Sequence, residues 1–216
     1  MSAPERHALR DGSPVLLRPI EPGDKERLRE GLRRLSPTSR YRRFMTGVPE
    51  LSARELAYLT EVDQRDHLAW IALDPSAPDL PALGVARAIR LPGEPQVAEA
   101  AITVVDSHQG RGLGGLLLAV LAREARRQGI ARFRAWVLAS NAPMLELLRR
   151  VGAEGTPEGE GVIRVEVPVL PSGAVPADTP AGRVLRAAAV EELRVVARPA
   201  PEEGSPRPPP PGTLPS

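Results

Sequence analysis

The chain has 216 residues, 26% charged and 42% hydrophobic, with a formal net charge of +2. This length is enough for one well-packed domain, and the lack of cysteine excludes disulfides, thiolate metal sites and a cysteine nucleophile. Lys25 is the single lysine, and the arginines are scattered rather than gathered into one basic run. Residues 1–14 lack the apolar stretch of a signal peptide, and no later segment resembles a membrane span. We therefore expect a cytoplasmic protein that binds neither nucleic acid nor membranes.

Short elements are predicted in the N-terminal third. Residues 14–18 have the composition of a β-strand, and an amphipathic helix then reaches about Leu35. Ser36, followed by proline, caps a second short helix. Ser52 caps a third, with Glu55 three residues later completing a capping box. The pattern predicts one strand followed by three short helices.

From residue 67 onward, apolar runs alternate with turns and then with helical patterns. The first two runs, with a turn-rich segment between them, predict an antiparallel pair. The predicted order is strand 67–73, strand 83–91, strand 97–105, helix 112–128, strand 130–138, helix 141–151 and strand 161–169.

The composition changes beyond Pro171, where proline-rich spacers surround a possible helix over residues 181–195. From about residue 199 the chain is of low complexity, which predicts disorder. The expected organisation is an N-terminal extension, a folded domain and a proline-rich C-terminal extension. These three parts cover residues 1–13, 14–170 and 171–216.

A glycine-rich segment, residues 109–115, lies between a predicted strand and a predicted helix. Glycines there let backbone N–H groups approach an anion, and the helix N-terminus adds unpaired donors, which suits a pyrophosphate. A Walker loop, and with it ATP hydrolysis, is disfavoured because Gly114 is followed by Gly115 and Leu116 instead of Lys and Ser/Thr. The letters of the dinucleotide pattern Gly-x-Gly-x-x-Gly are present. The segment lies midway along the chain, however, and the following strand ends near Ser140 without an acidic residue.

Residues 109–114, Gln-Gly-Arg-Gly-Leu-Gly, resemble the acetyl-CoA signature Gln/Arg-x-x-Gly-x-Gly/Ala of GNAT-family N-acetyltransferases. Residues 140–152 are similar to the Asn-led helix of that family. Residues 35–44 and 62–67 resemble segments of its bacterial protein-lysine acetyltransferase branch. The resemblance covers residues 14–169 and implies an α+β fold with a mixed, mostly antiparallel twisted sheet flanked by helices.

The resemblance also implies a cofactor site for acetyl-CoA as co-substrate. In it, backbone groups of Val104 and Val105 hold the pantetheine arm and the thioester carbonyl, the glycine-rich turn binds the pyrophosphate, and Asn141 lies across the cofactor. The implied cofactor-binding residues are Val104, Val105, Gln109, Gly110, Arg111, Gly112, Leu113, Gly114, Gly115 and Asn141. No His and carboxylate residues have metal-ligand spacing, so no metal is expected.

Glu99 is the candidate general base. An amine acceptor such as lysine is mostly protonated at neutral pH, which adds about 4 kcal/mol to the barrier unless a base removes the proton. Glu99 is the only charged residue within the small, apolar run 97–104, whose apolar neighbours would favour its protonation by desolvation. A glutamate at the matching place serves as base in the protein-lysine acetyltransferase branch. The alternative is a solvated glutamate on a strand surface.

The general acid expected from the resemblance is missing, because the usual tyrosine position in the Asn-led helix is Leu148. His67 and His108 are expected to have structural roles. The leading hypothesis is direct acetyl transfer from acetyl-CoA to an amine, with a protein lysine as the first choice. A small-amine acceptor is the first alternative. A non-catalytic acyl-CoA-binding regulatory module is the second, and Leu148 is the feature that permits it.

Overall fold

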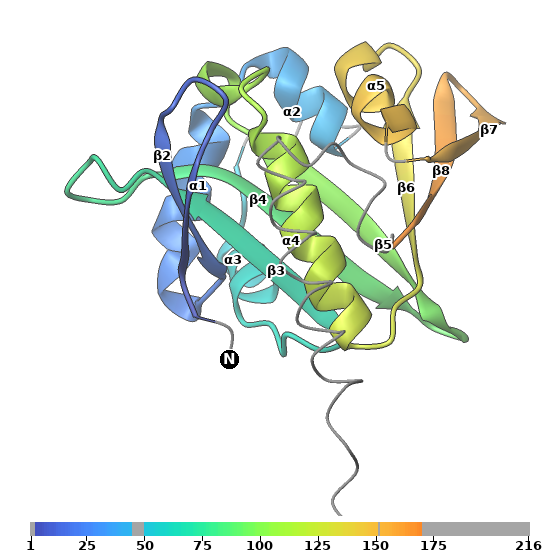
Figure 1. The fold of residues 1–216 in the computed structure, drawn as a ribbon, viewed down its shortest axis with the longest axis horizontal. Helices are drawn as coiled ribbons and strands as arrows, with labels where there is room; N and C mark the ends of the chain where they lie inside the picture. Colours follow the sequence, from blue (N-terminus) through green and yellow to red (C-terminus); the bar gives the residue numbers. More distant parts are fainter. Residues whose placement is uncertain (1–2, 45–49, 151, 170–216) are drawn as a thin grey trace, which may run out of the picture.

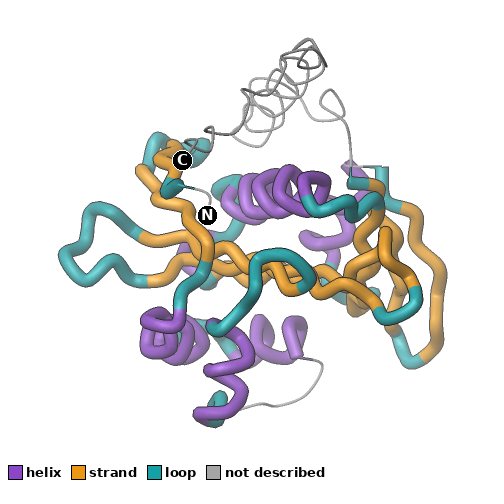
Figure 2. Tube along the Cα trace, turned by 90° about the horizontal axis from the view of Figure 1, so that it is seen from below, coloured by secondary structure: helices purple, strands orange, loops and turns teal. Residues whose placement is uncertain are grey.

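The computed structural model describes residues 3–44, 50–150 and 152–169. A twisted sheet runs through this part of the molecule, with α4 on one face and α1, α2 and α3 on the other (Figures 1 and 2). The helices are α1 Lys25–Arg33, α2 Pro37–Phe44, α3 Ala53–Thr60, α4 Leu113–Arg127 and α5 Ala142–Arg150. Two 3₁₀ turns accompany them, η1 Pro22–Asp24 and η2 Asp106–His108.

The sheet has eight strands in the order β1-β2-β3-β4-β5-β6-β8-β7. Every neighbouring pair is antiparallel except β5 and β6, which are parallel. The strands are β1 Glu5–Ala8, β2 Pro14–Pro19, β3 His67–Leu73, β4 Ala82–Leu91, β5 Glu94–Val104, β6 Arg132–Leu138, β7 Glu154–Gly159 and β8 Val162–Pro168. The expected mixed, mostly antiparallel sheet flanked by helices is therefore confirmed.

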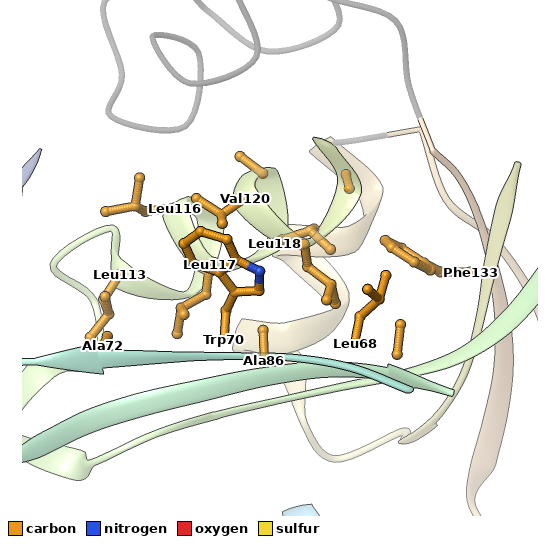
Figure 3. Packing of buried hydrophobic residues seen from close by; sticks show 14 of the residues in the cluster. Leu68, Trp70, Ala72, Ala86, Leu113, Leu116, Leu117, Leu118, Val120 and Phe133 are labelled. Atoms are coloured by element: carbon orange, nitrogen blue, oxygen red, sulfur yellow. The ribbon is translucent and has the colours of Figure 1, made fainter. Parts of the chain in front are cut away.

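The main core lies between the sheet and α4 (Figure 3). Alternate residues of β3 serve its two faces: Leu68, Trp70 and Ala72 pack toward α4, whereas Ala69 and Ile71 pack on the opposite side. This explains why β3 is a continuous apolar run rather than an alternating one. The α4 side chains that are completely buried are Leu113, Leu116, Leu117, Val120, Leu121 and Ala125.

The N-terminal helices α2 and α3 begin with the side-chain caps that the sequence predicts. Ser52 Oγ accepts the backbone N–H of Glu55 at 3.2 Å, and a Glu55 carboxylate oxygen accepts the backbone N–H of Ser52 at 2.8 Å. Ser36 Oγ accepts the backbone N–H of Ser39 at 3.2 Å. The capping box before α3 and the serine cap before α2 are confirmed.

Two strands, β1 and β7, are absent from the sequence-based expectation. β1 lies within residues 1–13, which the sequence assigns to an extension, yet it pairs with β2. β7 pairs with β8 through a two-residue turn, Glu160-Gly161, whose φ angles of 49° and 73° are those of a type I′ hairpin. Neither strand carries an apolar run, so partner strands rather than local propensity stabilise them. The extension over residues 171–216, with its possible helix at 181–195, lies outside the described residues.

An ion pair attaches β1 to α4, because both guanidinium nitrogens Nη1 and Nη2 of Arg123 donate to the Glu5 carboxylate at 3.0 and 2.5 Å. Burial alone would raise the pKa of Glu5, but hydrogen bonds from His7 and Arg123, together with their charges, lower this pKa to about 2. The ordinary value is 4.5. A lowered carboxyl pKa stabilises the fold above the unfolded-state pKa, and the contribution is lost as pH falls toward 2.

We therefore expect Glu5→Gln to reduce the free energy of unfolding by about 1–2 kcal/mol near neutral pH, a figure discounted for partial exposure of the pair. The difference from wild type should shrink steadily between about pH 5 and pH 2. Urea denaturation at several pH values measures both quantities. Glu154→Gln on the exposed strand β7 is the control and should show no such trend. A difference that does not depend on pH would contradict the assignment.

Candidate functional site

The site is built around the place where the parallel strands β5 and β6 separate (Figure 1). The two strands pair only from Val97 to Glu99 on β5, opposite Arg132 to Arg134 on β6. Beyond Glu99 no further pairing of these strands is found among the described residues. A cavity of about 690 Å³ occupies the opening, and both strands, α2, the glycine-rich turn and α5 line it.

The edge of β5 that faces this opening carries free backbone groups. The N–H of Val105 donates to the carbonyl of Leu83 at 3.0 Å, so Val104 and its partner Gly84 form a non-hydrogen-bonded pair. In such a pair the N–H and C=O groups point away from the neighbouring strand. Val104, and Ile102 two residues earlier, therefore direct backbone groups toward the cavity.

The structure places Val105 differently from the expectation. Its N–H bonds Leu83, its carbonyl accepts the N–H of His108 at 2.9 Å, and its side chain is buried in the core. Its backbone groups are thus already engaged, whereas those of Val104 face the cavity. The Gln109 side chain also has internal partners, because Nε2 donates to the Val104 carbonyl at 3.1 Å and to Ser39 Oγ at 3.2 Å.

The glycine-rich turn connects η2 to α4 and takes left-handed backbone conformations. Gly110 has φ 73° and Gly112, the N-cap residue of α4, has φ 91°. A Cβ on Gly110 would meet nothing within 4 Å, so the surface there is open. The first intrahelical bond runs from the Leu116 N–H to the Gly112 carbonyl. The N–H groups of residues 113–115 precede it and have no intrahelical acceptor, which makes this helix start a favourable place for an anion.

Arg10 adds a positive charge to this turn, from the connection between β1 and β2. Its N–H donates to the Arg111 carbonyl at 3.1 Å, and its side chain lies 3.2 Å from where a Cβ on Gly112 would stand. Arg10 lines the cavity, but Arg111 and Leu113 do not. Arg111 is paired with Asp11, and Leu113 is completely buried. Sequence reasoning missed Arg10, because its position depends on the β1–β2 hairpin, which no local pattern predicts.

Glu99 and Asn141 both line the cavity. Glu99 stands at the last paired position of β5 and β6, and its side chain is exposed rather than enclosed by its apolar neighbours. The carbonyl of Asn141 accepts the N–H groups of Met144 and Leu145 at 3.1 Å each, which starts α5. The structure thus brings together Glu99, Val104, Gln109, Gly110, Gly112, Gly114, Gly115 and Asn141 around one cavity.

Comparison with known protein families identifies the family to which a chain with this cavity and glycine-rich turn belongs. The model of the Acetyltransferase (GNAT) family matches residues 35–153. The chain belongs to the GNAT acetyltransferase family. The matched segment includes α2, the splayed strands, the glycine-rich turn and α5, and the resemblance stated from the sequence is confirmed.

Individual relatives of this GNAT chain include two acetyltransferases and one solved GNAT domain. Acetyltransferase Pat of Mycolicibacterium smegmatis is 36% identical over 190 residues, covering 88% of this chain and 56% of that protein. Acetyltransferase PA5475 of Pseudomonas aeruginosa is 34% identical over 148 residues, covering 68% of this chain and 79% of that protein. The crystal structure of the GNAT domain of S. lividans PAT is 32% identical with a TM-score of 0.70, covering 76% of this chain and 96% of that domain. The chain therefore spans little more than half the length of Pat.

The α5 side of the cavity of this GNAT domain is mostly apolar, with Glu146 as its charged residue. Leu148, at the position where the resemblance implies a tyrosine, is 5% exposed and packs into the core. Pro143, Met144 and Leu147 line the same side. A hydrocarbon side chain donates no proton, so α5 supplies shape but no acid at Leu148.

Neither His67 nor His108 lines the cavity. The ring nitrogen Nε2 of His67 accepts a hydrogen bond from Arg87 Nη1 at 2.7 Å, which requires a neutral ring with its proton on Nδ1. Burial and the charge of Arg87 lower the pKa of His67 to about 4. Within the described part of the chain, no three His, Asp or Glu residues are grouped to hold a metal ion, and no helix there is long and apolar enough to cross a membrane.

Proposed function

We propose that this chain transfers the acetyl group of acetyl-CoA directly to an amine, with a protein lysine as the first-choice acceptor. One observation carries the proposal: the free edge of β5 has the α4 N-terminus at one end and the Glu99 carboxylate at the other. At about 3.4 Å per residue, Val104 and Glu99 lie about 17 Å apart along the strand. A ligand that fits must therefore join a diphosphate to a long arm with a reactive end, and acetyl-CoA has this form.

The proposed cofactor contacts follow from the free groups described above. The N–H groups at the start of α4 and the open surface at Gly110 receive the pyrophosphate. The backbone of Val104 and Ile102 pairs with the pantetheine arm as a neighbouring strand would. Val104 rather than Val105 offers its N–H for this pairing, while the Val104 carbonyl already accepts a hydrogen bond from Gln109 Nε2, and Asn141 lines the opposite wall.

The proposed chemistry assigns one proton transfer to this chain. Acetyl-CoA, when bound, supplies an activated thioester. Glu99 accepts a proton from the acceptor ammonium, directly or through one water, and the neutral amine then forms the C–N bond as the C–S bond breaks. The nitrogen loses its second proton to solvent as the C–S bond breaks, and the departing thiolate takes a proton from solvent, because Leu148 offers none. Attack by the amine, rather than an acyl-enzyme, also agrees with the lack of cysteine.

The choice of a protein lysine is supported by the likeness to Pat and PAT proteins and by residues 35–44 and 62–67. The experiment is mass spectrometry of candidate proteins and small amines incubated with acetyl-CoA, with and without this chain. Enzyme-dependent acetylation of protein lysines supports the proposal, and modification of small amines alone would favour the first alternative. Binding of acetyl-CoA without any transfer would favour the non-catalytic module.

Arg10→Ala is expected to raise the Kd for acetyl-CoA about tenfold, because one charge-assisted contact to a phosphate is lost. The effect should shrink as salt is added, since the Arg10 side chain is exposed. Isothermal titration calorimetry at two ionic strengths measures both. Arg6→Ala, an exposed arginine on the same hairpin, is the matched control and should leave Kd unchanged. An equal loss in both variants would indicate damage to the hairpin instead.

A further inference from the structure

Arg43 and Arg87 line one small cavity on the α1–α3 face of the sheet, and neither donates a hydrogen bond to a carboxylate among the described residues. Arg87, on β4, is only 6% exposed. Its Nη1 donates to the neutral ring of His67 at 2.7 Å, and its Nη2 donates to the Leu59 carbonyl at 3.1 Å. Neither acceptor carries a negative charge, so the charge of Arg87 is hydrogen-bonded but not neutralised.

Arg43, at the end of α2, is the second of these arginines. Its guanidinium lies 5.0 Å from the centre of the Phe44 ring, and its side chain is half-buried. Burial lowers the pKa of Arg43, an effect that the charge of Glu99 opposes. Burial and the nearby charge of Arg43 lower the pKa of Arg87 to about 10, so both arginines remain protonated at neutral pH.

The sheet register places this pair beside the candidate base. Arg87 lies directly opposite Ala101, and Glu99 is two residues before Ala101 on the same face of β5. Diagonal neighbours of this kind have Cβ atoms about 7–8 Å apart. Arg43 lines the large cavity together with Glu99 and also lines a smaller one of about 80 Å³ together with Arg87 and Thr103.

Other buried or half-buried arginines differ in their partners: some have carboxylates, whereas Arg34 and Arg40 donate to backbone carbonyls. Arg18 donates to both carboxylate oxygens of Asp24 at 2.7 Å, and Arg134 donates to Glu94 and Glu166. A buried cation without a counter-charge, such as Arg87, is destabilising, and the nearby charge of Arg43 adds repulsion. A bound anion would offset both effects and would accept the remaining guanidinium N–H groups.

We propose that Arg43 and Arg87 bind a carboxylate carried by the acceptor, close to the amine that is acetylated. This inference rests on the proposed function. A bare ammonium group entering here would be attracted by Glu99 and repelled by the arginines. An acceptor that presents an ammonium to Glu99 and a carboxylate to the arginines matches both charges. In a protein acceptor this carboxylate belongs to an Asp or Glu side chain next to the target lysine, and in a free amino acid it is the α-carboxylate.

The test compares two peptides that differ only in one residue beside the lysine, Glu in one and its neutral isostere Gln in the other. Wild type should favour the Glu peptide about tenfold or more in kcat/KM, as for one charge-assisted contact. Arg43→Gln should bring this ratio close to one. Arg54→Gln, an exposed arginine on α3, is the matched control and should keep the preference. Free lysine compared with lysinamide distinguishes an α-carboxylate from a side-chain carboxylate.

A second measurement separates recognition from catalysis and folding. The same peptides with norleucine in place of lysine cannot react, and their binding is followed by calorimetry. Tighter binding of the Glu form to wild type, but not to Arg43→Gln or Arg87→Gln, supports the inference. Equal use and equal binding of the Glu and Gln forms by wild type overturns it, while acetylation of both leaves the proposed function standing. Acetylation of no peptide or protein contradicts the proposed function itself.

Discussion

Glu99→Gln is expected to lower kcat for acetyl transfer by about 10²–10³-fold, because the substituted side chain accepts no proton from the acceptor ammonium. The Kd for acetyl-CoA should stay within about twofold, since none of the proposed pyrophosphate contacts involves Glu99. The fold should also be retained, because the side chain is exposed and has no hydrogen bond in the described structure. Steady-state kinetics and calorimetry on the same preparation measure both quantities.

The control for this variant is Glu154→Gln, which makes the same change on the exposed strand β7, away from the cavity. It should retain wild-type kcat. An unchanged rate in Glu99→Gln would remove Glu99 from the mechanism and would leave an uncatalysed attack by the small neutral fraction of the amine. A rate that recovers with rising pH in the variant, as the amine loses its proton in solution, would support the role of Glu99 as base.

Trp70→Ala is expected to reduce the free energy of unfolding by about 3–5 kcal/mol, the usual range for removing a large aromatic side chain from a core. Trp70 is 1% exposed and lies between β3 and α4, with the Arg123 guanidinium 5.6 Å from its ring centre (Figure 3). Its removal would leave a cavity beside Leu117 and Val120. Urea denaturation followed by far-ultraviolet circular dichroism measures the change without using tryptophan fluorescence.

The chain offers a matched control, because it contains only two tryptophans. Trp136 is 36% exposed on β6, and its indole N–H donates to the Glu158 carboxylate at 2.9 Å. Trp136→Ala should cost about 1 kcal/mol or less, as for a surface position with one hydrogen bond. Equal losses in the two variants would show that Trp70 is not the centre of the core.

The sequence predicts most of this fold where a local pattern determines the element. β3 agrees with its predicted bounds, 67–73, because a buried strand between two helical layers is apolar throughout. α4 agrees within a residue, because its apolar face repeats at helical spacing and glycines flank it. β1 and β7 could not be predicted, since Glu5-Arg6-His7-Ala8 and Glu154 to Gly159 form strands only when a partner strand is present.

The residues of the candidate site likewise fall into those that the sequence predicts and those that only the tertiary structure reveals. The glycine-rich turn, Glu99 and Asn141 belong to contiguous motifs, and the structure brings them to one cavity. Arg10 and the Arg43–Arg87 pair come from segments far apart in the sequence, so only the tertiary structure relates them to the turn and to Glu99. Val105 lies in a contiguous motif, but the structure places its backbone groups differently from the expectation. Which residues of β5 direct backbone groups toward the cavity depends on the register with β4, and the sequence does not show that register.

Because β5 and β6 pair over only a short length, few backbone hydrogen bonds connect the two halves of the sheet. Three residue pairs join the five N-terminal strands to the three C-terminal ones there, against seven in the neighbouring β6–β8 ladder. A ligand that pairs with the free edge of β5 replaces the hydrogen bonds that β6 does not make there and connects the two halves of the sheet. In the proposed binding mode the co-substrate is also a structural element, and the number of residue pairs between β5 and β6 sets the width of the opening.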